Sequence, residues 1–375
     1  MTAPPKQLSV ADAEGVLSVV PHTLGFHPRE SLVVLIIAGT VLSATLRVDL
    51  PEKDPPDSDA ASAHAGTVAR YVRELPGATG AFLVAYSGRE PDVRSPYFRL
   101  VLALASTLRR GGISVPDAWY VGPTGWRSYF CPDGDCCPPG GHPLESVWLS
   151  DANLDLVLGG SSPRRGHWDG SPVRVWKQRD AVRAAVAAAL AGRGPRAPEL
   201  LERWCAALVG DPEATLERLR SDPVAAGTLL AGLRTLPVRD ALPFAAGVSG
   251  AAALAAVADI EGGVQDGPAA RQLGRFLLGD SRSAPDWRRL DLLWEVGREL
   301  LGAADGADRS ALLCVLAWVE WARGRSSPAA VLLEACLRAD PGHALARGLL
   351  AFVGRGVLPG WARDPATSWH RFGAP

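Results

Sequence analysis

The pattern of apolar and polar positions predicts strands alternating with helices in the N-terminal part of the chain. Leu32–Ile37 is a continuous apolar run, typical of a strand that is buried on both faces. Val41–Leu50 follows the turn Ala38-Gly39-Thr40 and predicts a second strand, paired with the first as a hairpin. In that strand we expect the odd-numbered residues from Val41 to Asp49 on one face. The even-numbered residues from Leu42 to Leu50, which include Ala44, should lie on the other face.

Further helices are predicted where apolar residues recur every three or four positions, and further strands where short apolar runs lie between turns. The helices are Val10–Val20, which we expect to end at Pro21, and those carrying the stripes Val68–Leu75 and Phe98–Leu108. The strands are Ala81–Tyr86, Ala118–Val121 and Trp126–Phe130. This order predicts an α/β domain over residues 1–158, with helices packed on a mixed sheet.

The C-terminal part has a different pattern. Residues 159–172 are rich in Gly, Ser and Pro and lack periodicity, so we interpret them as a linker. Beyond them helical stripes recur, and short segments with Gly, Pro and Asp separate the stripes. This pattern predicts an all-α helical bundle over residues 173–375.

Glu320–Pro341 is similar to one tetratricopeptide unit. Trp321 stands at the large aromatic position, Gly324 at the turn, and Ala329 and Cys336 at the small packing positions. Because about three repeats are needed for an independent solenoid, a single copy favours a tetratricopeptide-like hairpin within the bundle over a peptide-binding groove.

The run Cys131-Pro132-Asp133-Gly134-Asp135-Cys136-Cys137-Pro138-Pro139 places three thiols within seven residues. With His142 they form the spacing C-x4-C-C-x4-H, a candidate set of three sulfurs and one nitrogen for zinc. A second interpretation is a redox pair between Cys131 and either Cys136 or Cys137. A third is a structural loop whose thiols stay reduced, with Asp133 and Asp135 serving the turn.

A second candidate site precedes the first strand. His27, Arg29, Glu30 and Ser31 offer a base, a cation, an acid and a hydroxyl within five residues, in a loop at a strand end. Arg47 and Asp49 share a face of the second strand, where they pair with each other or face this site. The simpler interpretation is that Pro28 shapes a turn and Ser31 satisfies backbone groups.

Composition excludes several classes of function. The chain has 375 residues and a net charge of -1, and it lacks a basic stripe, so we expect no nucleic-acid partner. The N-terminus has no signal-peptide pattern, and the long uncharged stretch Ser31–Leu46 is shorter than the ~20 residues of a membrane helix. There is no P-loop, GxGxxG or HExxH motif. We therefore expect a cytoplasmic protein without membrane contact, whose thiols stay reduced.

Four segments together resemble an uncharacterised actinobacterial family, domain of unknown function 4192. They are Val20–Leu35 (VPHTLGFHPRESLVVL), Arg47–Pro51, Trp126–Cys131 followed by Cys136–Pro139, and Ala339–His343 near the C-terminus. The resemblance implies no activity, because no ligand or catalytic residue is established for that family. His142 lies outside the family's pattern, which leaves three thiols that need a fourth ligand from outside the loop.

Three functional hypotheses follow. The first is a binding or regulatory module that contacts a protein partner through its C-terminal helices. The second is a hydrolase or transferase for a small polar substrate, with His27 as base, Ser31 in the same loop, and Arg47 or Asp49 as orienting groups. The third is a thiol-based metal or redox sensor using Cys131, Cys136 and Cys137.

Overall fold

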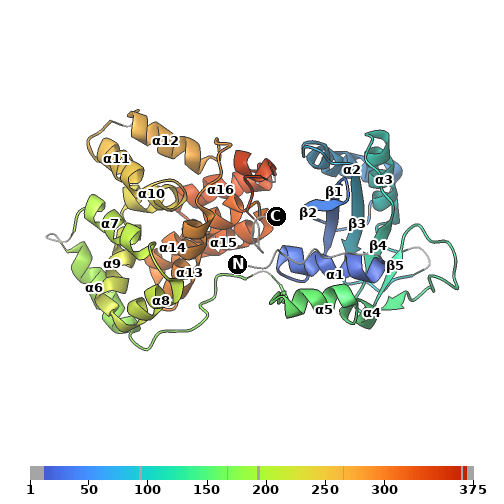
Figure 1. The fold of residues 1–375 in the computed structure, drawn as a ribbon, viewed down its shortest axis with the longest axis horizontal. Coiled ribbons are helices and arrows are strands. Elements are labelled where there is room, and N and C mark those ends of the chain that lie inside the picture. The colour runs from blue at the N-terminus through green and yellow to red at the C-terminus, as the bar shows by residue number, and fades with distance from the viewer. Residues whose placement is uncertain are drawn as a thin grey trace, which may run out of the picture. The chain divides into compact units, whose positions relative to one another are not determined.

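The computed structural model describes residues 12–92, 95–166, 168–191, 195–264, 266–364 and 366–369. The chain forms two compact units that divide after Gly166, within the segment interpreted as a linker (Figure 1). Residues just before this point belong to the first unit, where Arg164 forms a backbone bridge with Phe26. Among the described helices, none is both long and apolar enough to cross a membrane.

The N-terminal unit is built on a mixed sheet with the strand order β2-β1-β3-β4-β5-β6. The strands are β1 (Ser31–Ala38), β2 (Val41–Asp49), β3 (Gly80–Tyr86), β4 (Ala118–Val121), β5 (Gly125–Ser128) and β6 (His142–Pro143). Only β3 and β4 are parallel; the other neighbours in this order are antiparallel. The predicted α/β domain with a mixed sheet is confirmed. The two-residue strand β6 was not expected, because it is too short to leave a periodic pattern.

Helices cover both faces of this sheet (Figure 1). One face packs against α2 (Ser58–Arg73) and α3 (Phe98–Arg110), and the other against α1 (Ala13–Leu24) and α4 (Leu144–Trp148). Helix α5 (Asp151–Leu158) packs beside α1. Strand β1 sends Leu32, Val34 and Ile36 to the α2–α3 side and Val33 and Leu35 to the α1 side. Its continuous apolar run therefore reflects burial on both faces, as predicted.

One bulge changes the facing of side chains in β2. The pairing of β1 with β2 shifts register so that Ile36 faces Ala44 while Ile37 faces Leu42. An extra residue in one strand reverses the alternation of its side chains beyond that point. Leu42 therefore packs on the α1 side of the sheet, whereas Ala44 packs on the α2–α3 side. The expectation that Leu42 and Ala44 share one face is wrong.

Helix α1 continues through Pro21, so the expected end at this residue is wrong as well. Proline removes one backbone hydrogen bond, but the helix runs on to Leu24. Gly25 ends it in a left-handed conformation (φ 84°), and its N–H donates to the Pro21 carbonyl oxygen at 2.7 Å. The stop signal is therefore the glycine. Val10, where the helix was expected to begin, lies outside the described residues.

The regular elements in the described part of the C-terminal unit are all helices, which confirms the predicted all-α domain (Figure 1). Its helices are α6 (Arg179–Leu190), α7 (Ala197–Ala207), α8 (Pro212–Ser221), α9 (Pro223–Leu233), α10 (Leu236–Gly247), α11 (Gly250–Glu261), α12 (Pro268–Leu277), α13 (Trp287–Leu300), α14 (Gly306–Ala322), α15 (Ser326–Ala339), α16 (Ala344–Gly354) and the short 3-10 helix η1 (Gly360–Arg363).

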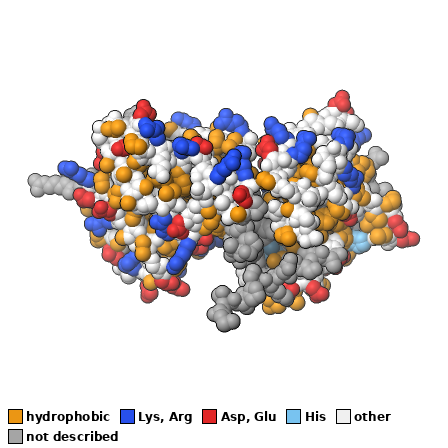
Figure 2. All heavy atoms as spheres, turned by 45° about the horizontal axis from the view of Figure 1, so that its top comes forward, with side chains coloured by type: hydrophobic (Ala, Val, Ile, Leu, Met, Phe, Trp, Pro, Cys, Tyr) orange, Lys and Arg blue, Asp and Glu red, His pale blue; other side chains and the backbone are white. Residues whose placement is uncertain are grey.

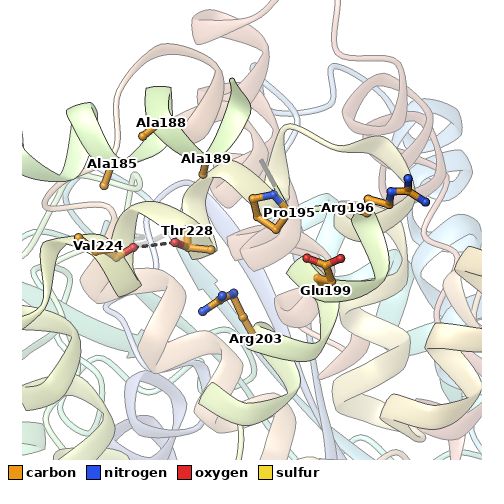
Figure 3. A pocket seen from close by; sticks show the side chains of 9 residues that line it. All are labelled: Ala185, Ala188, Ala189, Pro195, Arg196, Glu199, Arg203, Val224 and Thr228. Carbon is orange, nitrogen blue, oxygen red and sulfur yellow. Dashed lines mark hydrogen bonds between the residues drawn. The ribbon is translucent and has the colours of Figure 1, made fainter. Parts of the chain in front are cut away.

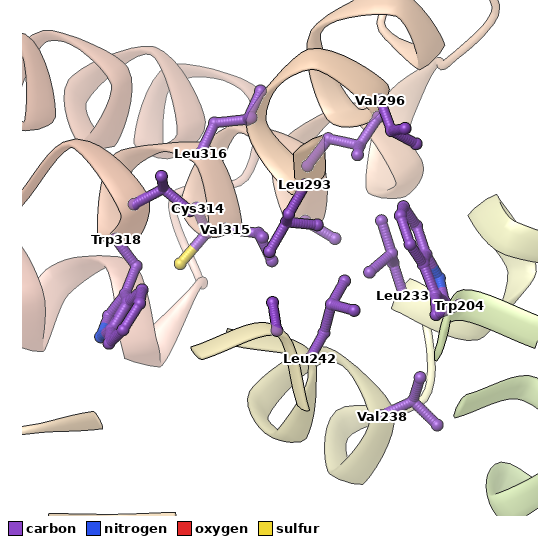
Figure 4. Close-up of a cluster of buried hydrophobic side chains, with 14 of the residues drawn as sticks. Trp204, Leu233, Val238, Leu242, Leu293, Val296, Cys314, Val315, Leu316 and Trp318 are labelled. Atoms are coloured by element: carbon purple, nitrogen blue, oxygen red, sulfur yellow. The ribbon is translucent and has the colours of Figure 1, made fainter. Parts of the chain in front are cut away.

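Helix α14 lies at the centre of this unit. Every residue from 310 to 322 is buried, as expected of a helix that is surrounded by others. Figure 4 shows Val315 of α14 facing Leu242 of α10 and Leu293 of α13. The turn to α15 contains Gly324 with φ 76°, and α14 and α15 form a tightly packed hairpin. Ala329 and Cys336 are fully buried along it.

The aromatic cluster at the C-terminal end of this unit gives a test of the fold. Trp361 is fully buried, donates its Nε1–H to the Ala322 carbonyl at 2.8 Å, and stacks on Phe276 with ring centroids 5.1 Å apart. We predict that Trp361→Ala lowers the free energy of unfolding of the helical unit by about 3–5 kcal/mol. Trp148→Ala, which removes an indole that is 53% exposed, should cost about 0.5 kcal/mol or less. Urea denaturation followed by circular dichroism checks both variants, and equal losses would contradict the packing described.

Candidate functional site

The two loops with candidate residues leave the sheet at opposite ends. Strand β1 begins at the end of the sheet where β3 and β4 finish and where β5 starts. Strand β5 then runs to the other end, and residues 129–141, the cysteine loop, follow it. His27 precedes β1 and Cys131 follows β5, so the two residues do not belong to one composite site.

The cysteine loop turns back along the edge of the sheet. Arg127 of β5 is buried and donates from Nη1 to the Pro138 carbonyl oxygen at 2.7 Å. The loop ends in β6, where His142 pairs with Trp126 of β5. It therefore covers a strand edge that would otherwise present free backbone groups to another chain.

Asp133 shapes the turn inside this loop. Its carboxylate oxygen Oδ1 accepts from the backbone N–H of Asp135 at 2.9 Å and of Cys136 at 3.4 Å. Its carbonyl oxygen accepts from the N–H of Cys137 at 2.7 Å. Asp side chains often fold a chain back on itself in this way. The turn returns Cys136 and Cys137 toward Cys131.

The three sulfur atoms converge as a result. The Sγ atoms of Cys131, Cys136 and Cys137 all lie within 4.8 Å of one another. Cys136 is exposed, Cys131 is half-buried, and Cys137 is only 4% exposed. The Cys137 sulfur lies close enough to the Ser128 backbone of β5 for that backbone to affect its pKa. The cluster is thus anchored at one thiol and open to solvent at another.

The three thiols differ in acidity. The neighbouring Asp133 backbone and, to a smaller extent, the Cys137 thiol lower the pKa of Cys131. The neighbouring Cys131 raises the pKa of Cys136. Burial raises the pKa of Cys137 to about 11. Cys131 is therefore the first of the three to lose its proton, and thiolates are the reactive and metal-binding form.

His142 has a different environment from the one expected of a fourth ligand. Its ring stacks on Trp126 with centroids 4.5 Å apart and an interplanar angle of 25°. Among the described residues, the sulfur atoms of the three cysteines lie close together, and His142 is not part of this group. A fourth donor for an ion at these sulfurs therefore has to come from solvent or from another molecule.

The loop before β1 brings together only part of its candidate set. Ser31 is buried, donates its hydroxyl to the Arg29 carbonyl at 2.6 Å and accepts from Arg47 Nε at 2.8 Å. Arg47 also pairs with Asp49 at 2.6 Å, one of the two expected arrangements. His27 is exposed, and surrounding protein lowers its pKa through desolvation, with a smaller contribution from His22. The Ser31 hydroxyl proton is therefore engaged in the hydrogen bond to the Arg29 carbonyl oxygen.

A buried chain of hydrogen bonds around His22 was not predicted. His22 is 1% exposed; its Nδ1 lies 2.8 Å from Ser161 Oγ and its Nε2 lies 2.9 Å from Asn153 Oδ1. The Asn153 amide donates to the Trp148 carbonyl, so its Oδ1 faces the ring and Nε2 carries the proton. A serine, a histidine and an amide in this sequence of hydrogen bonds resemble the catalytic residues of a hydrolase. Ser161 is only 3% exposed, however, so a substrate does not reach its hydroxyl. The chain joins α1, α5 and the segment after α5.

A second missed feature lies at the carboxyl ends of the parallel strands β3 and β4, where α/β sheets commonly bind ligands. Glu30 and Tyr97 both have positive φ, of 41° and 62°, and they are the non-glycine residues in that conformation within the described ranges. Glu30 accepts from the Gly88 N–H at 2.6 Å, and the Arg89 guanidinium lies 5.1 Å above the Tyr97 ring. Glu30 thus binds the segment after β3, and Arg89 of that segment packs on Tyr97. These contacts connect the loop before β1 to the ends of the parallel strands.

The helical unit has a hollow of about 540 Å³ between α6, α7 and α9 (Figure 3). Small apolar side chains form much of its lining, and Arg196, Glu199 and Arg203 of α7 and its N-terminal edge supply the charges. Thr228 donates to the Val224 carbonyl within it. Figure 2 shows acidic and basic side chains interspersed over the visible face of each unit.

The fold and the cysteine loop define a class of protein: an α/β unit with a three-thiol loop on its sheet edge, joined to a helical unit. The profile of the family Domain of unknown function (DUF4192) matches residues 14–360, so the chain belongs to this family. No curated protein matches the chain significantly. No solved structure does so either.

Differences in exposure and acidity predict an order of thiol reactivity. With limiting iodoacetamide at neutral pH, Cys131 and Cys136 should be alkylated first, and Cys137, Cys314 and Cys336 much later. Burial raises the pKa of Cys137, so its labelling should increase as the pH approaches 11. Peptide mass spectrometry of metal-free protein measures each site. Equal labelling of Cys131 and Cys137 would contradict the described geometry.

The His22 chain predicts a loss of stability. We expect His22→Ala to lower the free energy of unfolding of the α/β unit by about 2–4 kcal/mol, because it removes the ring partner of buried Ser161 and partly buried Asn153 and leaves a cavity. His27→Ala removes an exposed ring five residues away and should change stability by about 0.5 kcal/mol or less. Urea unfolding of both variants tests this. Matching effects would show that His22 has no special role.

Proposed function

We propose that this protein is a thiol-based metal-binding and regulatory protein of the cytoplasm, whose ion is held by Cys131, Cys136 and Cys137. The observation that carries the proposal is the convergence of three sulfur atoms within 4.8 Å. Two thiolates bound to a tetrahedral zinc ion with Zn–S bonds of about 2.3 Å lie roughly 3.8 Å apart. Small side-chain rotations in an exposed loop are therefore enough to bind zinc.

The surroundings of the sulfurs also support a metal ion. The Asp133 backbone lowers the pKa of Cys131, and the Ser128 backbone opposes the burial that raises the pKa of Cys137; both effects favour the thiolate form. Three thiolates and one Zn²⁺ have a net charge of −1, and buried Arg127 contributes a positive charge where the loop is attached. Thiolate donors favour soft ions such as zinc over magnesium or calcium.

An incomplete set of protein ligands favours a regulatory site over a purely structural one. Structural zinc sites have four protein ligands, whereas sites that exchange ligands keep one position open. His142 stacks on Trp126, which supports an open fourth position next to the exposed Cys136. The ion can then accept a ligand from solvent or from a partner.

The hydrolase or transferase hypothesis receives less support. A nucleophilic or orienting serine needs its hydroxyl available to the base and the substrate. The Ser31 hydroxyl instead donates to the Arg29 carbonyl and accepts from Arg47. We therefore favour the role of a backbone anchor for Ser31, with Arg47 and Asp49 as its supporting ion pair.

We assign contacts with a protein partner to the helical unit. The hollow between α6, α7 and α9 has a lining of small apolar side chains mixed with polar ones, and the charged residues are two arginines and one glutamate (Figure 3). This chemistry suits a peptide segment with small apolar side chains and an acidic residue. The α14–α15 hairpin, which resembles a single tetratricopeptide unit, then serves the core instead of a groove, because Trp321 and Ala329 are buried.

The metal hypothesis is tested on reduced full-length protein loaded with Zn²⁺ and freed of excess ion. Elemental analysis should find about one zinc per chain, and Cys131→Ser or Cys136→Ser should lower the occupancy at least roughly tenfold. Cys205→Ser, a change at a half-buried cysteine of the helical unit, should have no effect. His142→Ala should also retain zinc. Wild-type protein that binds no zinc would overturn the proposal, and loss of zinc in His142→Ala would replace it with a four-ligand site.

A further inference from the structure

We propose that peroxide oxidises Cys131 and Cys136 to a disulfide and thereby releases the bound ion, so that the cysteine loop is a redox-controlled metal site with Cys137 as its permanent anchor. The release of an ion rests on the metal-binding function proposed above. The choice of the disulfide pair does not, because it follows from the geometry of the loop and applies equally to metal-free protein.

Access to solvent selects two of the three thiols. Cys136 is exposed and Cys131 is half-buried, and the residues between them, 132–135, are all exposed. A dissolved oxidant therefore reaches these two sulfurs first. The sulfurs already lie within 4.8 Å of each other, and Gly134 between them has nothing within 4 Å of its Cβ position. The loop can close to an S–S bond of about 2.05 Å without displacing packed residues.

The third thiol is held in place by the sheet. Cys137 is 4% exposed, and its N–H donates to the Asp133 carbonyl at 2.7 Å, so this residue is buried and its backbone is held by the turn. Pairing Cys131 with Cys137 would remove this sulfur from the β5 edge. Pairing Cys136 with Cys137 would join adjacent residues, whose Cα atoms are only 3.8 Å apart, closer than disulfides normally allow.

The oxidation is balanced with hydrogen peroxide as the oxidant. The Cys131 thiolate attacks one peroxide oxygen, the O–O bond breaks, and a sulfenic acid and hydroxide form. The Cys136 thiolate then attacks the Cys131 sulfur, the S–O bond breaks, and a second hydroxide leaves as the disulfide forms. Two electrons pass from the two sulfurs to the peroxide, and two protons from solvent convert the hydroxides to water. An ion on the cluster loses two of its three thiolates and dissociates.

The experiment treats reduced full-length protein with peroxide in two forms, metal-free and zinc-loaded. Remaining thiols are blocked with N-ethylmaleimide, and cleavage before aspartate separates Cys131 from Cys136 and Cys137. Tandem mass spectrometry should find the Cys131 peptide joined to Cys136, with Cys137 blocked. A chromogenic chelator should record the release of all bound zinc in step with disulfide formation.

Two variants serve as controls. The possible outcomes separate the inferred disulfide from the proposed metal-binding function. Cys136→Ser alters an exposed side chain and should form no disulfide within the loop, whereas Cys205→Ser should behave as wild type. Thiols that stay free after peroxide, or a disulfide that includes Cys137, would overturn the inference while zinc binding by reduced protein still stands. A Cys131–Cys136 disulfide in protein that never binds zinc would overturn the proposed metal function and the release step with it.

Discussion

A buried arginine attaches the cysteine loop to the edge of the sheet. Arg127 belongs to β5, and its hydrogen bond to the Pro138 carbonyl holds the loop of residues 129–141 against this strand. Without this attachment, β5 would be protected only by the two residues of β6. The loop thus covers the edge of β5 whether or not a ligand is bound. Its attachment to this edge determines the position of the three thiols.

The convergence of the thiols follows from this attachment and from the Asp133 turn. Each alone would be insufficient: the turn brings Cys136 and Cys137 back, and the sheet edge gives Cys137 a fixed position beside Ser128. Three sulfurs so close together cannot all ionise without repelling one another, and protonation, a cation or a disulfide relieves this repulsion. The metal-binding and redox roles proposed for the loop are two ways of relieving the same repulsion.

The sequence predicted those features of the fold that repeat along the chain. The apolar run of β1 and the helical stripes of α2 and α3 were identified because many residues share one pattern, and so was the change to an all-α unit. Single-residue events were missed. The bulge that moves Leu42 to the other face depends on pairing between strands, and the continuation of α1 past Pro21 depends on the cap at Gly25.

The candidate site was predictable only in part, for a similar reason. The density of cysteines identified the loop, but which donors converge depends on how the loop folds on β5, and spacing alone placed His142 among them. The hydrogen bonds of His22 join residues that are more than a hundred positions apart and leave no local pattern. The helical unit has its own core around α14.

The central claim is that three cysteine sulfurs of one loop bind an ion and leave its fourth position open. X-ray absorption at the zinc edge of zinc-loaded, reduced full-length protein measures the ligands directly. The account predicts three sulfur atoms at about 2.3 Å and one lighter atom, oxygen or nitrogen, without the outer-shell signal of an imidazole. A spectrum with two or fewer sulfurs, or with a clear imidazole contribution, would contradict it.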